Sequence, residues 1–207
     1  MILVFASNNA HKLSEVRAIM PKGIEVLSLK EIGFDSDIDE TGQTLAENSR
    51  IKAETVMEWL SDHQSSNRLS IDGVFADDTG LEIDALDGEP GVYTARWAER
   101  DTGIHLSEMD TYAANRQKAL RELEGKTNRG CQFKTVITLI MDGHMLQVDG
   151  IVRGTMTTEE HGQGGFGYDP IFVPEGYDKT FGELSADIKN NISHRARAMQ
   201  ALVDIIK

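Results

Sequence analysis

The chain has 207 residues, of which 40% are hydrophobic and 27% are charged, and its formal net charge is −13. This length and composition suit one globular domain over residues 1–207 with a substantial core. The negative charge argues against binding to nucleic acid or acidic membranes, although a small polyanion could still bind at a local basic cluster. The sequence has no apolar run of membrane-spanning length, no signal peptide and one cysteine, Cys131, so we expect a cytoplasmic location.

Hydrophobic periodicity in the first 70 residues predicts a strand followed by helices. Ile2–Phe5 is an apolar run typical of a buried strand, and a helix follows it that ends at Pro21 and Gly23. Thr44 and Glu47 have the spacing of a capping box, which predicts a helix from there to residue 60. We expect the polar stretch 61–70 to be a surface connection.

The sequence of the second half of the chain predicts a β-hairpin that lies between two helices. A helix is expected over residues 108–123, and β-branched and apolar residues predict a strand over 132–141. Asp142-Gly143 is typical of a two-residue hairpin turn into a second strand over 145–152. A short strand at 171–173 and a terminal helix beginning at Ser193 complete the chain. The fold class is therefore α/β, with a mixed sheet.

The most informative segment runs from Phe75 to Asp84. Two adjacent carboxylates, Asp77 and Asp78, follow an apolar run and precede an expected Thr79-Gly80 turn and a second short strand. Successive side chains of an extended chain point to opposite faces, so these carboxylates do not share one solvated surface. We expect one of them to face a cleft at the end of the sheet, where α/β proteins bind cations and phosphates. The alternative is an Asp-rich turn, in which Asp hydrogen-bonds its own backbone.

The loop between the first strand and the first helix is a candidate phosphate site. Helix N-termini present unpaired N–H groups and a positive dipole end, and Ser7, Asn9 and Lys12 add donors and charge there. The alternative is that Asn9 simply caps the helix. The glycine spacing and the Lys-Ser/Thr pair of a Walker loop are missing from this segment.

A second basic corner lies at the start of the terminal helix. His194 and Arg195 directly follow the expected cap Ser193, and Lys189 lies just upstream. Two cations at the positive end of a helix are unfavourable unless an anion or an electron-rich base edge binds them. A solvated basic patch is the alternative.

Residues 162–170 combine four glycines with Phe166 and Tyr168. Glycine allows the backbone to approach a ligand closely, and an aromatic face can stack on a nucleobase. The alternative is a tight turn with Phe166 in the core.

Candidate metal ligands in this chain are carboxylates. The sequence carries no HExxH motif, paired cysteines or histidine cluster, which makes zinc an unsuitable metal. Hard oxygen ligands suit Mg²⁺, and Glu40 and Asp78 are preferred because the capping box is expected to occupy Glu47. Cys131 is predicted to be a small core residue of a strand.

Several of these segments form a pattern that spans nearly the whole chain. They are residues 7–12, 40–44, 47–48, Lys52, 76–81, 88–96, 164–172, Lys189 and 193–195. In this order they resemble the inosine triphosphate pyrophosphatase family, which removes non-canonical purine nucleoside triphosphates. Asn8 stands where the family usually has Gly, and Thr79 and Thr94 stand where Ser is more usual.

The resemblance implies an elongated mixed β-sheet flanked by helices, two lobes around a central active-site cleft, and a homodimer. It implies Mg²⁺-dependent hydrolysis of ITP, dITP and XTP to the nucleoside monophosphate and pyrophosphate, with Asp78 as general base and with Glu40 and Asp78 holding the metal. The implied triphosphate cradle consists of Ser7, Asn8, Asn9, Ala10, His11, Lys12, Lys52 and Thr79. The implied base and sugar side consists of Phe166, Gly167, Tyr168, Asp169, Lys189, His194 and Arg195.

Three other functions remain open from the residues alone. A related pyrophosphatase could act on modified pyrimidine or methylated nucleotides, with similar phosphate chemistry and a different base pocket. A nucleotide-binding regulator without catalysis would have little use for two acidic metal ligands beside a basic cradle. A purely structural role would leave the glycine-aromatic loop and the His-Arg pair unexplained.

Overall fold

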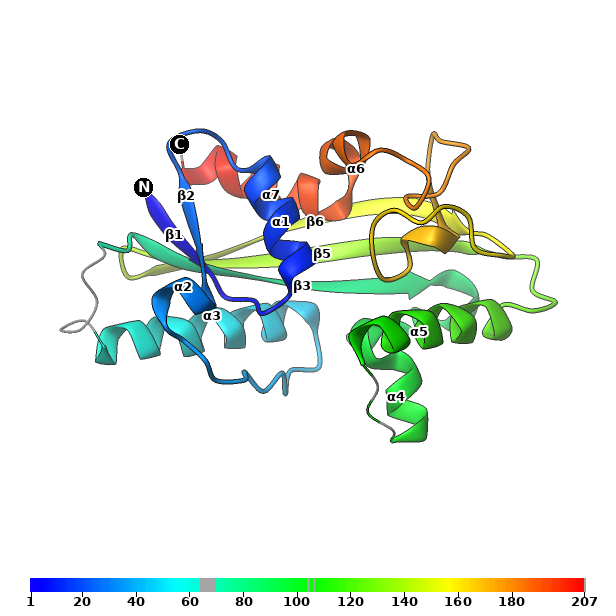
Figure 1. Cartoon of the computed structure of the whole chain (residues 1–207), viewed down its shortest axis with the longest axis horizontal. Helices are drawn as coiled ribbons and strands as arrows, with labels where there is room; N and C mark the ends of the chain where they lie inside the picture. Colours follow the sequence, from blue (N-terminus) through cyan, green and yellow to red (C-terminus); the bar gives the residue numbers. More distant parts are fainter. Residues whose placement is uncertain (64–69, 104, 106, 207) are drawn as a thin grey trace. The chain divides into compact units, whose positions relative to one another are not determined.

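The computed structural model describes residues 1–63, 70–103, 105 and 107–206 (Figure 1). The chain divides into two units. Unit 1 consists of Met1–Asp78, Thr135–Gly150 and Arg195–Lys207, and unit 2 consists of Thr79–Lys134 and Ile151–His194. None of the helices in the described ranges has both the length and the apolar character needed to cross a membrane.

The strands form a mixed sheet. In the described part of the chain they pair in the order β2-β1-β3-β5-β6-β7, and β4 pairs with β3. Their bounds are β1 Ile2–Phe5, β2 Glu25–Ser28, β3 Gly73–Ile83, β4 Pro90–Gly91, β5 Gly130–Met141, β6 His144–Met156 and β7 Phe172–Pro174. Strand β1 pairs in parallel with β2 and β3, whereas β3–β4 and β6–β7 are antiparallel. The predicted mixed sheet is confirmed.

In unit 1, helices cover both faces of the strands. Helices α1 (Ala10–Ile19) and α7 (His194–Ile206) lie on one side of β1 and β3, and α3 (Leu45–Asp62) lies on the other (Figure 1). Helix α2 (Leu29–Ile32) follows β2 and packs on the side of α3. Thr44 and Glu47 form the predicted capping box at the start of α3. The cap fixes where this helix begins, and the helix carries Lys52 on its buried side.

Strand β3 is one continuous strand, so the predicted turn at Thr79-Gly80 is wrong. Its side chains alternate strictly within unit 1. Phe75 packs in the cluster formed with α1 and α7, while Val74 and Ala76 pack in the cluster formed with α2 and α3. Gly80 adopts the extended conformation here because pairing with neighbouring strands outweighs its turn preference. Since the alternation continues to the end of unit 1, it sends Asp77 and Asp78 to opposite faces.

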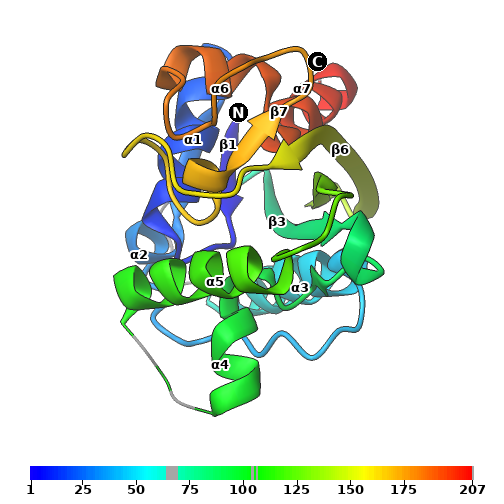
Figure 2. The same ribbon diagram turned by 90° about the vertical axis from the view of Figure 1, so that its right-hand side faces the viewer.

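Unit 2 has a core of its own. Helix α5 (Glu108–Glu122) contributes Ala119, and Leu123 follows at its end; both pack against Phe133, Phe172 and other buried residues of the unit. Helix α4 (Trp97–Thr102) lies beside α5, and α6 (Ala186–Ile192) is a separate short helix (Figure 2). Cys131 of β5 is buried, and burial raises the pKa of its thiol to about 12, as expected for a core residue.

The predicted strands at 2–5, 132–141, 145–152 and 171–173 and the four predicted helices are confirmed, with shifts of a few residues at their ends. Asp142 and Gly143 both have positive φ, as the predicted hairpin turn requires. The predicted connection at 61–70 falls mostly on residues 64–69, outside the described residues. Sequence patterns missed β2, α2, β4, α4 and α6. These elements span at most seven residues, which is too short for a helical or alternating period to be visible.

Candidate functional site

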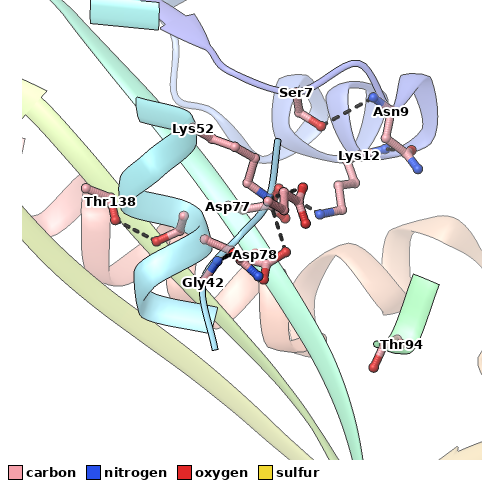
Figure 3. A network of polar contacts seen from close by, with 12 residues as sticks. Ser7, Asn9, Lys12, Gly42, Lys52, Asp77, Asp78, Thr94 and Thr138 are labelled. Atoms are coloured by element: carbon pink, nitrogen blue, oxygen red, sulfur yellow. Dashed lines mark hydrogen bonds and ion pairs between the residues drawn. The ribbon is translucent and has the colours of Figure 1, made fainter. Parts of the chain in front are cut away.

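Asp77 and Asp78 are buried on opposite faces of β3, with 1% and 7% of their surface exposed. Burying a carboxylate is unfavourable unless a cation or a hydrogen-bond donor compensates it. Both carboxylates contact basic side chains, which come from different helices (Figure 3). The prediction that the two carboxylates do not share one solvated surface is confirmed.

The face of β3 beside α1 and α7 carries a buried ion-pair chain. Lys12 Nζ lies 2.9 Å from Asp77 Oδ1, and Arg195 binds Asp77 Oδ2 through Nε and Nη2, both at 3.0 Å. The Arg195 guanidinium also pairs with Glu15 of α1. Although burial alone would raise it, the charges of Lys12 and Arg195 hold the pKa of Asp77 well below its usual range. Asp77 is therefore an anion that fixes two cations.

The opposite face of β3 carries Asp78 beside α3. Lys52 Nζ lies 3.1 Å from Asp78 Oδ1 and 2.9 Å from Glu40 Oε1, so one ammonium bridges two carboxylates. Burial raises the pKa of Asp78, the charges of Lys52 and Lys12 oppose this shift, and Glu40 adds to it. Against the effect of burial, Asp78 and Glu40 raise the pKa of Lys52, which stays cationic.

Asp78 Oδ2 is buried and has no hydrogen-bond partner among the residues that the structure describes. Leaving a buried acceptor unsatisfied costs on the order of 1–3 kcal/mol, so this oxygen points to a missing donor or cation. The arrangement fits Mg²⁺, which typically takes one or two carboxylates and completes its shell with substrate phosphates and water. The described residues contain no group of three or more His, Cys, Asp or Glu side chains that could hold a metal by themselves.

The loop before α1 forms a conventional helix start. Asn9 Oδ1 accepts from Lys12 N at 3.0 Å, so Asn9 caps the helix as the alternative interpretation held, and Ser7 Oγ accepts from Asn9 N at 3.3 Å. Asn8, Ala10 and His11 are exposed. Lys12 points from the first turn to Asp77, which explains a lysine at a position that the helix dipole disfavours.

In unit 2, the glycine-aromatic loop is organised by a second buried ion pair. Asp169 Oδ2 accepts from Lys189 Nζ at 2.5 Å and from Phe166 N at 2.7 Å. The Lys189 ammonium also lies 4.7 Å from the centroid of the half-buried Phe166 ring. Gly165 has φ +70°, and a Cβ there would collide with the Asp169 carboxylate. The glycine is required because it lets this carboxylate reach the backbone.

Other predicted residues of unit 2 are buried. Tyr168 packs near Phe133 and donates its hydroxyl to Thr94 O at 3.0 Å, so Tyr168, rather than Phe166, is the loop's core aromatic. His194 stacks on Phe133 with ring centroids 4.8 Å apart. Thr94 Oγ1 accepts from Leu81 N at 2.8 Å. Thr79 is half-buried on β3, and Gly167 has a positive φ of 60°.

The structure thus brings the predicted site residues together in two groups. The group in unit 1 consists of Lys12, Lys52, Glu40, Asp78 and Arg195. The group in unit 2 consists of Phe166, Asp169 and Lys189. Arg195 was expected beside the nucleobase, and its contacts are with Asp77 and Glu15. His194 and Arg195 do not form a solvated patch, because both are at least 95% buried.

Sequence reasoning assigned no individual role to two polar residues of unit 1. Glu15 pairs with Arg195 from 180 positions away, which no local pattern indicates. Asn48 is fully buried, and its place four residues before Lys52 on one helix could have marked it as facing the same way.

Comparison with known proteins agrees with this architecture. The model of the Ham1 family matches residues 3–205. A dITP/XTP pyrophosphatase of Flavobacterium johnsoniae is 45% identical over 206 residues, which cover 100% of this chain and 98% of that protein. A dITP/XTP pyrophosphatase of Bacillus subtilis is 40% identical over 208 residues, covering 99% of this chain and 96% of that protein.

Solved structures give the same result. The Ham1 protein of Staphylococcus aureus matches with a TM-score of 0.81 at 37% identity, covering 100% of this chain and 98% of that one. The resemblance drawn from the sequence motifs and the α/β fold with a mixed sheet are confirmed. Because the family model and these relatives span essentially the whole chain, the chain belongs to the Ham1 family.

Proposed function

We propose that this chain hydrolyses the non-canonical purine nucleoside triphosphates ITP, dITP and XTP to the nucleoside monophosphate and pyrophosphate, and so cleanses the nucleotide pool. The observation that carries the proposal is the full-length relationship to two dITP/XTP pyrophosphatases at 45% and 40% identity. The buried acidic and basic cluster on β3 supplies the chemistry that such a reaction needs. The whole chain acts as one pyrophosphatase domain.

Unit 1 handles the triphosphate. A triphosphate brings about four negative charges, and hydrolysis places further charge on the leaving pyrophosphate, so fixed cations stabilise the transition state. Lys12 and Lys52 supply these cations, together with the N–H groups at the start of α1, where Ser7, Asn8, Asn9, Ala10 and His11 lie. The Thr79 hydroxyl is assigned to the triphosphate on the basis of the family resemblance. Asp77 holds Lys12 in place, since its other oxygen is anchored by Arg195.

Asp78 acts as the general base. Its Oδ2 has no partner in the described part of the chain, and burial keeps its pKa above the usual carboxyl value, which makes it a better proton acceptor. Asp78 and Glu40 would hold Mg²⁺ through their carboxylate oxygens. When bound, Mg²⁺ neutralises phosphate charge and lowers the pKa of water. A water then attacks phosphorus, its proton passes to Asp78, and the bond to pyrophosphate breaks.

Unit 2 reads the base. Hypoxanthine and xanthine present O6 and N1–H where adenine presents an amino group and a bare N1, so a site that donates to O6 rejects adenine by leaving buried groups unpaired. Phe166 offers the half-buried aromatic face of this loop, with Gly167 allowing close approach. Asp169, Lys189, Tyr168 and His194 complete the base and sugar side.

The experiment that tests the function is pyrophosphate release with Mg²⁺ from ITP, dITP and XTP beside ATP, GTP, CTP and UTP. We expect strong preference for the first three. Preferred turnover of a pyrimidine or methylated nucleotide would instead favour the related pyrophosphatase. Tight binding of one nucleotide with no product would favour a regulator.

We expect Asp78→Asn to abolish turnover and leave a folded protein, because the amide cannot accept the proton of water while Lys52 retains Glu40 as a partner. Activity is measured by pyrophosphate release and folding by circular dichroism. Retained activity would remove Asp78 from the role of base.

We also propose a homodimer, on the basis of the family resemblance. Light scattering after gel filtration should give twice the 22.9 kDa chain mass. A monomer at micromolar concentration would contradict the assignment.

A further inference from the structure

Two buried polar atoms of unit 1 have no hydrogen-bond partner in the protein. They are Asn48 Nδ2 and Asp78 Oδ2, and among the described residues only one other buried side-chain polar atom, Arg116 Nε, is in this condition. Arg116 has an ion-pair partner in Glu160, 3.0 Å from that nitrogen. Asn48 is 0% exposed and Asp78 is 7% exposed. Because buried polar groups are nearly always satisfied, the unit 1 pair requires an explanation.

The orientation of the Asn48 amide is determined by its neighbour. Gly42 N donates to Asn48 Oδ1 at 2.8 Å. If the amide oxygen and nitrogen of Asn48 were exchanged, its NH₂ group would face the Gly42 N–H, and two donors would meet. The oxygen is therefore the end that faces Gly42, and the NH₂ group is the end on the opposite side. The fit is close, since a Cβ on Gly42 would lie 2.6 Å from Asn48 Oδ1. The Nδ2 donor is therefore fixed, and it is left without an acceptor.

Two connections link Asn48 to the ion pairs that Asp78 makes. Asn48 and Lys52 are four residues apart on α3 and both are buried, so they share one face of that helix, and Lys52 reaches Asp78 Oδ1 (Figure 3). Gly42, which binds Asn48, is two residues from Glu40, which binds Lys52. The loop and the helix thus both lead to Lys52, which pairs with Glu40 and with Asp78.

The two unpaired atoms are complementary to one kind of guest. Nδ2 can only donate a hydrogen bond, whereas a carboxylate oxygen can accept a hydrogen bond or bind a cation, and a cation would be repelled by Nδ2. A phosphate oxygen would suit Nδ2 but would repel Asp78 Oδ2. A water molecule can do both, because its oxygen accepts from Nδ2 while one of its protons is donated to Oδ2.

We propose that Asn48 is a catalytic residue that positions the attacking water. This inference rests on the proposed function. Nδ2–H donates to the water oxygen and occupies one lone pair, which leaves the other directed at phosphorus. As the new O–P bond forms, one water proton passes to Asp78 Oδ2, and the breaking P–O bond leaves its electron pair on pyrophosphate.

Two variants separate this role from a structural one. Asn48→Asp keeps an oxygen for Gly42 N–H and removes the donor, whereas Asn48→Ala removes both. The proposal predicts that each variant loses roughly 100-fold or more in kcat for ITP, the usual effect of removing one well-placed donor. A purely structural amide predicts that Asn48→Asp retains kcat and that only Asn48→Ala loses it, which would overturn the proposal.

Binding supplies a readout that is independent of turnover. The Kd of a non-hydrolysable ITP analogue with a methylene bridge between the α- and β-phosphates, measured by calorimetry with Mg²⁺, should stay within about threefold of wild type in both variants. A loss of affinity that parallels the loss of kcat/KM would mean that Asn48 contacts the substrate instead, which would overturn the proposal.

The matched control is Ser49→Ala. Ser49 is the next residue of α3 and equally buried, but its hydroxyl is satisfied by Thr138 Oγ1 at 2.6 Å. We expect this variant to lower the melting temperature and to leave kcat within about twofold, since it removes only packing and the hydrogen bonds of this hydroxyl with Thr138 and Ala46.

A crystal structure of the wild-type protein with the same analogue and Mg²⁺ keeps the proposal testable if the variants fail to fold. The expected result is an ordered water within hydrogen-bond distance of both Asn48 Nδ2 and Asp78 Oδ2. A direct contact of Nδ2 with phosphate, or no water there, would overturn it. A wild-type enzyme without any triphosphate hydrolysis would overturn the proposed function as well, whereas an active wild type with fully active Asn48 variants would overturn only the role of Asn48.

Discussion

Asp77 and Asp78 are neighbours in the sequence, yet their surroundings differ because consecutive side chains of a strand point to opposite faces. Asp77 is saturated by Lys12 and Arg195, and Asp78 keeps one oxygen without a partner. The saturated carboxylate is suited to hold cations, and the unsaturated one is suited to take a proton. The two carboxylates are therefore given different roles according to how many of their oxygens already have partners on their own face of β3.

The substitution Asp77→Asn should destabilise the protein by about 3–5 kcal/mol at neutral pH, because it leaves Lys12 and Arg195 without their shared buried anion. The pKa of Asp77 in the folded chain lies below the unfolded value of about 3.9, so the stabilisation is present above that pH and is lost as the pH falls. Urea unfolding of wild type and variant at pH about 7 and about 3 should therefore show the difference shrinking in acid.

The exposed residue Asp37 provides the control for this measurement. Asp37→Asn should change the free energy of unfolding by less than about 0.5 kcal/mol at either pH. An Asp77→Asn effect that small at neutral pH would show that the buried ion pairs contribute little.

Among the helices, strands and loops, backbone conformation decides where charged groups can meet. The capping box of Thr44 and Glu47 fixes the start of α3, and the helix then carries Lys52 to Asp78. In unit 2, the positive φ of Gly165 lets the Asp169 carboxylate bind both Lys189 and the loop backbone.

Gly165→Ala tests this arrangement against a matched neighbour. Both Gly165 and Gly167 have positive φ, so alanine costs roughly 1–2 kcal/mol of strain at either position. Only at Gly165 does a Cβ meet the Asp169 carboxylate, while at Gly167 nothing lies within 4 Å. We expect Gly165→Ala to lower the melting temperature more and to raise KM for ITP more than Gly167→Ala does. Equal effects of the two variants would show that the Asp169 contact is unimportant.

For the whole molecule, a net charge of −13 coexists with a cluster of half-buried Lys12 and buried Lys52 and Arg195. Each of these cations is paired with carboxylates, which makes burial tolerable without a ligand. Repulsion nevertheless remains among them. Burial lowers the pKa of Lys12, and the charges of Lys52 and Arg195 lower it further against the opposing effect of Asp77. Such a cluster suits a polyanion that arrives with its own metal.

We therefore expect Mg²⁺ to bind weakly alone, with Kd above about 1 mM, and at least tenfold more tightly with a non-hydrolysable nucleotide, because Glu40 and Asp78 supply only part of an octahedral shell. Calorimetry with and without the nucleotide measures this. Glu40→Gln should weaken the metal affinity of the nucleotide complex. Micromolar binding of Mg²⁺ alone would mean that the protein provides further ligands.

The chain sequence by itself determined the longer elements and the motifs. Three examples are the buried run Ile2–Phe5, the capping box at Thr44 and the Asp142-Gly143 turn. Each depends on interactions between residues a few positions apart, so each can be predicted from the local sequence. The motif order also identified the family, because chemically demanding residues recur at fixed places along the whole chain.

Only the tertiary structure decided which partners these residues have. Thr79-Gly80 is extended instead of turned because sheet pairing overrides a local preference. Arg195 binds Asp77 and Glu15 although 118 and 180 positions separate them, and Asn48 has an unpaired donor that no sequence pattern reveals. Charge pairing and burial depend on distances in space, which the order of residues along a chain does not contain.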